Sequence, residues 1–69
     1  MRIGDRVQIR PSFDLIEMRL MPLSFLYGVV VEVVIGRSGE VIGCWVELEK
    51  EPYLEEKEWY IPIISLQNE

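Results

Sequence analysis

A β-branched run, followed at once by a glycine-bounded turn and a second apolar segment, constrains the fold of this sequence more than any other feature. Residues 27–35 (YGVVVEVVI) have the composition of a long, mostly buried strand. Residues 36–39 (GRSG) carry a glycine at either end and predict a hairpin turn. Residues 40–48 predict the returning strand, with Cys44, Val46 and Leu48 facing inward and Trp45, Glu47 and Glu49 facing outward. The centre of the chain is therefore expected to be an antiparallel β-hairpin.

Shorter strands are expected on both sides of this hairpin. Residues 3–10 alternate, so that Ile3, Val7 and Ile9 share one face while Arg6, Gln8 and Arg10 share the other. Residues 59–61 (WYI) predict a short strand, in which only one of the two adjacent aromatic rings can face the core. Residues 62–65 (PIIS) predict a tight 3₁₀-type turn that leads into a last short strand at Leu66. Between the third and fourth strands, residues 49–58 predict an acidic loop.

The segment between residues 11 and 26 is unusually apolar for a connection. Nine of its residues are large and apolar: Phe13, Leu15, Ile16, Met18, Leu20, Met21, Leu23, Phe25 and Leu26. Ser12 or Asp14 is expected to cap a single helical turn that Pro22 ends. On such a turn, Leu15 and Met18 share one side while Ile16 and Leu20 share the other, so both sides are apolar. We therefore expect an ordered connection with more apolar surface than one side of a core needs.

Four short motifs occur in a characteristic order along the chain. They are Gly-Asp-x-Val-x-Ile at residues 4–9, Gly-x-Val-x-x-Val at 28–33, a hydrophobic strand around 45–48, and a segment at 59–66 with an Ile-Pro-x-x-x-Leu pattern. Together they resemble the SH3-like barrel superfamily, and especially its small KOW-like bacterial members. The uneven spacing of the second motif suits a strand bent by a bulge.

The resemblance implies an all-β fold: a small five-stranded SH3-like barrel that spans residues 1–69 as a single domain, with one helical turn in the long 11–26 loop. Members of this superfamily bind peptides, modified tails, ribosomal RNA or other subunits of larger complexes. Because one fold supports many functions, the resemblance implies a binding module without naming its ligand.

The residue types needed for most catalytic chemistry are scarce in this sequence. There is no histidine and only one cysteine, Cys44, whose place on the inward face of a strand indicates a buried structural thiol. We therefore expect no enzyme activity, no catalytic residue, no metal site, no cofactor and no small-molecule substrate. No apolar run approaches the roughly 18 residues of a membrane-spanning helix, and arginines interrupt the N-terminus, so a cytoplasmic protein without membrane contact is expected.

The net charge of −5 is distributed unevenly. Residues 1–37 carry a balance of +1, whereas residues 38–69 carry a balance of −6. An acidic balance disfavours general binding to phosphate backbones, because lysines and arginines supply that affinity. The glutamates of residues 47–58 indicate either a solvated strand face or a docking surface for a basic partner.

The residues expected to contact a partner are apolar and aromatic side chains in excess of what so small a barrel can bury. They are Phe13, Leu15, Met18, Leu20, Met21, Phe25, Trp45, Tyr53, Trp59 and Tyr60. Their number favours a protein-interaction or assembly module whose partner is another protein or a second copy of the chain. The competing interpretation of Trp45 is that the 11–26 segment folds over it and forms a small additional core.

Nucleic-acid binding is the alternative function. Arg2, Arg6 and Arg10 share one face of the first strand, and with Arg37 they could form the basic stripe of a KOW-like RNA- or DNA-binding module. The simpler interpretation is a polar strand face whose arginines pair with neighbouring glutamates, and it is preferred here.

Overall fold

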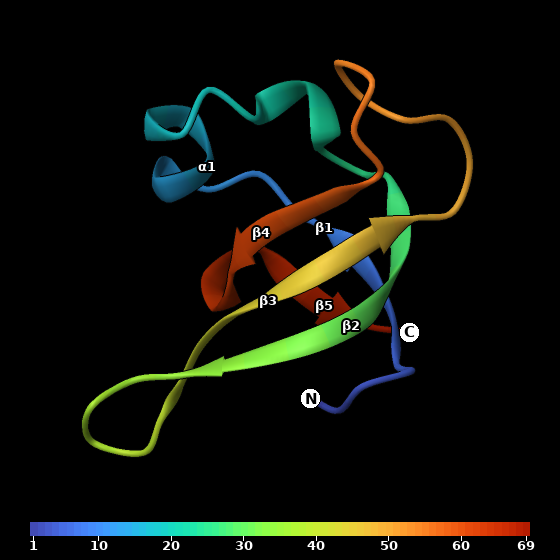
Figure 1. Cartoon of the computed structure of the whole chain (residues 1–69). Helices are drawn as coiled ribbons and strands as arrows, with labels where there is room; N and C mark the ends of the chain where they lie inside the picture. Colours follow the sequence, from blue (N-terminus) through green and yellow to red (C-terminus); the bar gives the residue numbers. More distant parts are fainter.

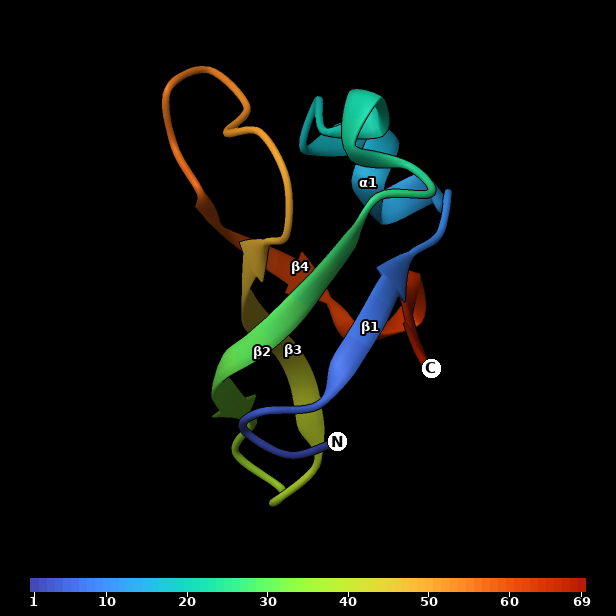
Figure 2. The same ribbon diagram turned by 90° about the vertical axis from the view of Figure 1, so that its right-hand side faces the viewer.

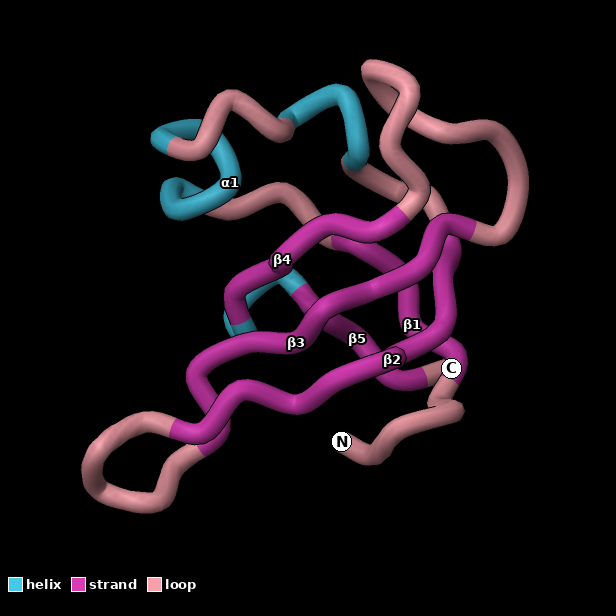
Figure 3. The backbone as a smooth tube through the Cα atoms, viewed as in Figure 1, coloured by secondary structure: helices cyan, strands magenta, loops and turns pink.

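Five antiparallel strands form a single sheet in the computed structural model, which describes residues 1–69 (Figure 1). The strands are β1 (Arg6–Ile9), β2 (Tyr27–Ile35), β3 (Val41–Leu48), β4 (Glu58–Pro62) and β5 (Leu66–Asn68). Their order across the sheet is β4-β3-β2-β1-β5. The predicted all-β fold with five strands is therefore confirmed, and Figure 3 shows how little of the backbone is helical.

The sheet is not closed into a barrel by hydrogen bonds. Strand β4 pairs only with β3 and strand β5 pairs only with β1, so both remain edge strands. A 3₁₀ turn, η2 (Ile63–Ser65), separates the two edge strands, as the PIIS segment predicts. The short helix α1 (Phe13–Glu17) contacts both β4 and η2, so the 11–26 connection lies beside the open edge of the sheet.

A bulge bends strand β2 at the position that its spacing predicts. Val30 pairs with Val46 and Glu32 pairs with Trp45, which leaves Val31 as the extra residue on β2. The hairpin that follows is also as expected, with the Gly36 amide bonded to the Glu40 carbonyl oxygen at 2.7 Å. Local turn chemistry and β-branched composition are therefore sufficient to predict the central hairpin.

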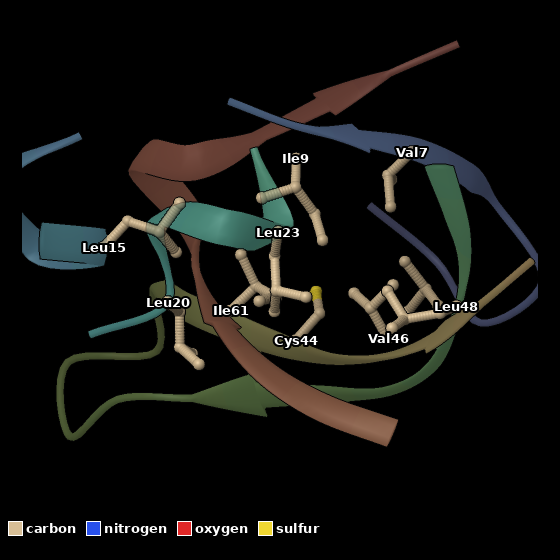
Figure 4. Close-up of a cluster of buried hydrophobic side chains, with 10 residues drawn as sticks. Val7, Ile9, Leu15, Leu20, Leu23, Cys44, Val46, Leu48 and Ile61 are labelled. Carbon is tan, nitrogen blue, oxygen red and sulfur yellow. The ribbon is translucent and has the colours of Figure 1, made fainter. Parts of the chain in front are cut away.

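The core lies between the inner face of the sheet and the 11–26 connection (Figure 4). Its members from the sheet include the three predicted inward residues of β3, and three leucines of the connection complete it. The ten buried residues are Val7, Ile9, Leu15, Leu20, Leu23, Val30, Cys44, Val46, Leu48 and Ile61. Because the three leucines pack on the same face as Cys44 and Val46, they lie on the side of the sheet opposite Trp45. The interpretation in which the 11–26 segment covers Trp45 is therefore wrong.

The 11–26 connection begins with the expected helical turn but ends it earlier than predicted. The Ser12 hydroxyl caps α1 by accepting a hydrogen bond from the Leu15 amide at 3.1 Å. The helix ends at Glu17, and Arg19 then adopts a positive φ of 60°. Pro22 does not end α1; it lies at the start of a separate 3₁₀ turn, η1 (Met21–Leu23), where its fixed φ is tolerated.

The prediction that Ile3 shares the inward face of β1 with Val7 and Ile9 is wrong. Ile3 precedes the strand in a turn, where Gly4 has φ of +95° and the Asp5 amide bonds to the Arg2 carbonyl oxygen. This turn breaks the alternation, because side chains alternate between faces only within extended backbone. The chain contains no helix that could span a membrane.

Candidate functional site

An apolar surface is formed where α1 meets η2. Phe13 is 85% exposed and Ile16, one helical turn later, is 52% exposed. Hydroxyl groups of Ser12 and Ser65 hydrogen-bond to each other and join the two elements. On η2, Ile63 is partly exposed and Ile64 is 69% exposed. We call Phe13, Ile16, Ile63 and Ile64 the α1–η2 surface.

Two of the predicted contact residues are unavailable to a partner. Leu15 and Leu20 are buried in the core, so their inclusion among the contact residues is wrong. The predicted pairs on the helical turn are also wrong: Leu15 is buried while Met18 is exposed, and Leu20 is buried while Ile16 is exposed. A turn of five residues is too short for spacing alone to define its buried side, and the helical backbone does not continue to Leu20, because Arg19 adopts a positive φ.

A groove of about 580 Å³ lies between the start of β2 and the 49–58 loop. Phe25, Leu26 and Tyr27 line one side, and residues Leu48 to Tyr53 line the other, with Arg6 between them. Figure 1 shows the loop and the 11–26 connection at the same end of the molecule. The sequence predicts three members of this groove as site residues: Phe25 and Tyr53 as partner contacts and Arg6 under the nucleic-acid alternative. It provides no local signal that they share a groove, because they come from three separate segments.

Arg6 and Glu49 form the single ion pair of the structure, at the edge of this groove. Arg6 Nε and Nη2 both donate to the Glu49 carboxylate, the second at 3.1 Å, and the guanidinium carbon lies 4.1 Å from the centre of the Tyr27 ring. The hydrogen bonds that Arg6 donates to the Glu49 carboxylate lower the pKa of Glu49, and the same bonds raise the pKa of Arg6.

We expect Glu49→Gln to destabilise the fold at neutral pH and to have no effect in acid. Because Arg6 holds the pKa of Glu49 below its ordinary 4.5, the stabilisation is complete above that ordinary value and is lost as the pH falls through the lowered one. Thermal unfolding of wild type and variant between neutral pH and about pH 2 measures the difference. A difference that is the same at every pH would show that the charge of Glu49 contributes nothing.

The four predicted arginines lie in different surroundings, and Arg2 belongs to the turn that precedes β1. Arg6 pairs with Glu49, and Arg10 lies over the Phe25 ring at 5.3 Å and bonds to Gln8 and Gln67. Arg37 belongs to the β2–β3 hairpin, which both views place at the end of the molecule opposite α1 (Figures 1 and 2). The interpretation in which strand arginines pair with glutamates therefore holds for Arg6.

The predicted aromatic residues of the sheet divide between its two faces. Trp59 packs against the core and Tyr53, and its indole nitrogen donates to the Glu56 carbonyl oxygen at 2.9 Å. Tyr60 lies on the outer face against Trp45, with ring centres 5.9 Å apart in an edge-to-face arrangement. Only one of the two adjacent rings faces the core, as alternation requires.

Cys44 is buried among aliphatic side chains, as the sequence predicts. Burial raises the pKa of its thiol, so the reactive thiolate is disfavoured near neutral pH. The glutamates of residues 47–58 do not gather with other acidic or cysteine side chains into a group of three that could hold a metal ion.

Comparisons with protein-family models, with curated proteins and with solved structures find no match to this chain.

Proposed function

We propose that this chain is a non-catalytic protein-interaction module that contacts a second protein chain through the α1–η2 surface. The observation that carries the proposal is the exposure of Phe13, which lies with the half-exposed Ile16 on a helix whose third apolar residue, Leu15, is fully buried. If the 11–26 connection only covered the core, the three leucines would be sufficient. The side chains of Phe13 and Ile16 beside them are exposed and lie outside the core.

The free energy available from this surface is appreciable. Burying a large apolar side chain is worth about 1.5–3 kcal/mol. Phe13, Ile16 and Ile64 are each more than half exposed, and η2 is joined to α1 through the serine hydroxyls. Side chains held on ordered backbone lose less conformational entropy on binding than those of a flexible loop. A partner chain that covered all three would therefore gain several kcal/mol.

Two further observations support the non-catalytic and SH3-like parts of the proposal. The chain has no histidine, and its one thiol is buried with a raised pKa. The strand order β4-β3-β2-β1-β5, the bulge in β2 and the 3₁₀ turn between β4 and β5 are compatible with a small SH3-like barrel. The pairing of Arg6 with Glu49 weighs against the nucleic-acid alternative.

We expect the double variant Phe13→Ser, Ile16→Ser to weaken association by at least about tenfold, since it removes two apolar contacts from the interface. Sedimentation velocity over a wide range of concentrations measures self-association. If the wild type is monomeric, affinity capture from cell extract measures association with another protein. Both substitutions replace exposed side chains, so the fold should be retained.

Ile3→Ser is the matched control, because Ile3 is 70% exposed but lies before β1 and outside the α1–η2 surface. It should leave association unchanged. A wild-type monomer that binds no hydrophobic dye and captures no protein would overturn the proposed function. Equal loss of association in the double variant and in Ile3→Ser would overturn the assignment to this surface.

A further inference from the structure

A second candidate surface lies on the outer face of strands β3 and β4, away from the core. Trp45 and Tyr60 are register partners there, and Trp45 is 38% exposed. The Tyr60 ring lies over Gly43, where a Cβ atom would collide with its phenol group. Gly43 therefore permits the position of Tyr60, and the two rings, in edge-to-face contact, form an aromatic platform on the outer face.

Three glutamates surround this platform without a cationic partner. Glu32 on β2 is the register partner of Trp45, and Glu47 is the register partner of Glu58. Glu47 and Glu58 lie two residues from Trp45 and Tyr60 on their strands, so they share the outer face. The single ion pair of the structure involves none of the three. We call Glu32, Trp45, Glu47, Glu58 and Tyr60 the aromatic–acidic face.

The pairing of Glu47 with Glu58 has a cost in the isolated chain. Like charges directly opposite one another on neighbouring strands destabilise a sheet. A cation placed between the two carboxylates would reverse the sign of this interaction. The chain as a whole also favours a cationic partner, because its net charge is −5 overall and −6 in residues 38–69.

We propose that the aromatic–acidic face binds an arginine-bearing segment of a partner protein. A guanidinium group is planar, so it can stack on an indole or phenol ring while its N–H groups bond to carboxylates beside the ring. Lysine provides a more strongly hydrated point charge and lacks the flat surface for stacking. The inference rests on the proposed function, because it adds a second contact region and a partner chemistry to the same interaction module.

The spacing of the face suits an extended segment. Register partners on neighbouring antiparallel strands have Cβ atoms about 4.5–5.5 Å apart, and residues two apart on one strand are separated by roughly 7 Å. One arginine of the partner segment can therefore stack at Trp45 and Tyr60, while a second arginine two positions along that segment reaches Glu47 and Glu58. Two arginines separated by one small residue match this arrangement.

The test is a titration of ¹⁵N-labelled protein with the peptide acetyl-Arg-Gly-Arg-Gly-Arg-amide, followed by NMR. The chain has two tryptophans, so it shows two indole N–H signals. The Trp45 signal should shift on addition of peptide. The Trp59 signal should remain in place, because its N–H group already donates to Glu56 and its ring packs on the core. The corresponding lysine peptide should bind about fivefold more weakly.

Two double variants with equal changes of net charge separate specific binding from general attraction. Glu47→Gln, Glu58→Gln should weaken binding of the arginine peptide about tenfold. Glu40→Gln, Glu55→Gln removes two exposed glutamates from the β2–β3 hairpin and from the tip of the 49–58 loop, and should weaken binding less than about twofold. Trp45→Val should weaken binding about fivefold and keeps a residue favourable in a strand.

Equal weakening by the two glutamate double variants would overturn the inference, and so would shifts of both indole signals or equal affinity for the lysine peptide. The proposed function has a separate test, because association through Phe13 and Ile16 is measured without peptide. Loss of association in Phe13→Ser, Ile16→Ser with no shift at Trp45 would overturn the inference alone. The opposite outcome is also informative. If the peptide shifts the Trp45 signal, the Glu47→Gln, Glu58→Gln variant reduces that shift, and Phe13→Ser, Ile16→Ser leaves association unchanged, the inference is supported and the α1–η2 assignment is overturned.

Discussion

Leu15→Ala is expected to lower the free energy of unfolding by about 2–5 kcal/mol, whereas Ile16→Ala should lower it by about 0.5 kcal/mol or less. The two residues are adjacent on α1, and both substitutions remove three side-chain carbons. Leu15 is fully buried in the core, while Ile16 is more than half exposed. Truncating Leu15 therefore leaves a cavity, and truncating Ile16 leaves only water-exposed surface.

Urea denaturation followed by circular dichroism measures both variants. A domain of this size is expected to have a stability of roughly 3–10 kcal/mol, so the loss at Leu15 is a large fraction of the total. Equal effects of the two substitutions would contradict the description of the 11–26 connection as part of the core. The comparison also separates two roles, because Ile16→Ala is expected to weaken association through the α1–η2 surface while leaving the fold stable.

Gly28→Ala is expected to lower the free energy of unfolding by about 2–3 kcal/mol or more, although alanine is otherwise more favourable than glycine in a strand. A Cβ atom at position 28 would lie 2.6 Å from the Glu47 carbonyl oxygen and would also overlap the Val46 side chain. The carbonyl oxygen is backbone of the neighbouring strand. Relief of the overlap therefore requires β2 and β3 to separate near the Gly28–Leu48 pair.

Gly36→Ala is the control for this prediction. A Cβ atom there would meet the Glu40 carboxylate, which is the end of a flexible side chain, and the Cγ2 methyl group of Ile42, but no backbone atom of a neighbouring strand. Neither Gly28 nor Gly36 has a positive φ, so backbone strain does not distinguish them. We expect Gly36→Ala to cost about 1 kcal/mol or less. Equal destabilisation by the two variants in urea denaturation would contradict the close approach of β2 and β3.

The proposed surfaces differ in how far the sequence predicts them. Phe13 and Trp45 are predicted as exposed contact residues, and both are exposed. Leu15 and Leu20 are predicted in the same way but are buried. The contributions of Ile63 and Ile64 are not predicted. The sequence does contain a usable signal for them, because a tight turn with two adjacent isoleucines cannot bury both side chains.

The 49–58 loop illustrates a feature without a signal in the sequence. Tyr53 and Glu56 form an isolated bridge around Leu54 and Glu55, which both have positive φ. Asparagine and glycine are the residues that normally occupy such positions. The packing of Tyr53 and Trp59 against the core, together with the bond from the Trp59 indole to Glu56, supports this turn.

The sequence by itself determined the features that depend on local chemistry. β-branched composition and alternation determined strands β2 and β3 and their inward residues, and glycines determined the hairpin. Polar capping residues determined that α1 starts near Ser12 or Asp14, and the structure selects Ser12. These follow from backbone sterics and from hydrogen bonds between residues close in the chain.

Only the tertiary structure decided which of two adjacent apolar residues is buried and which distant charges meet. The choice between Leu15 and Ile16 depends on where α1 contacts β4 and η2, and the pairing of Arg6 with Glu49 joins residues 43 positions apart. The sheet also remains open, because β4 and β5 each pair on one side only. Burial and long-range pairing are properties of the packed chain. In a short turn, neither the spacing of apolar residues nor helix propensity indicates which residue is buried.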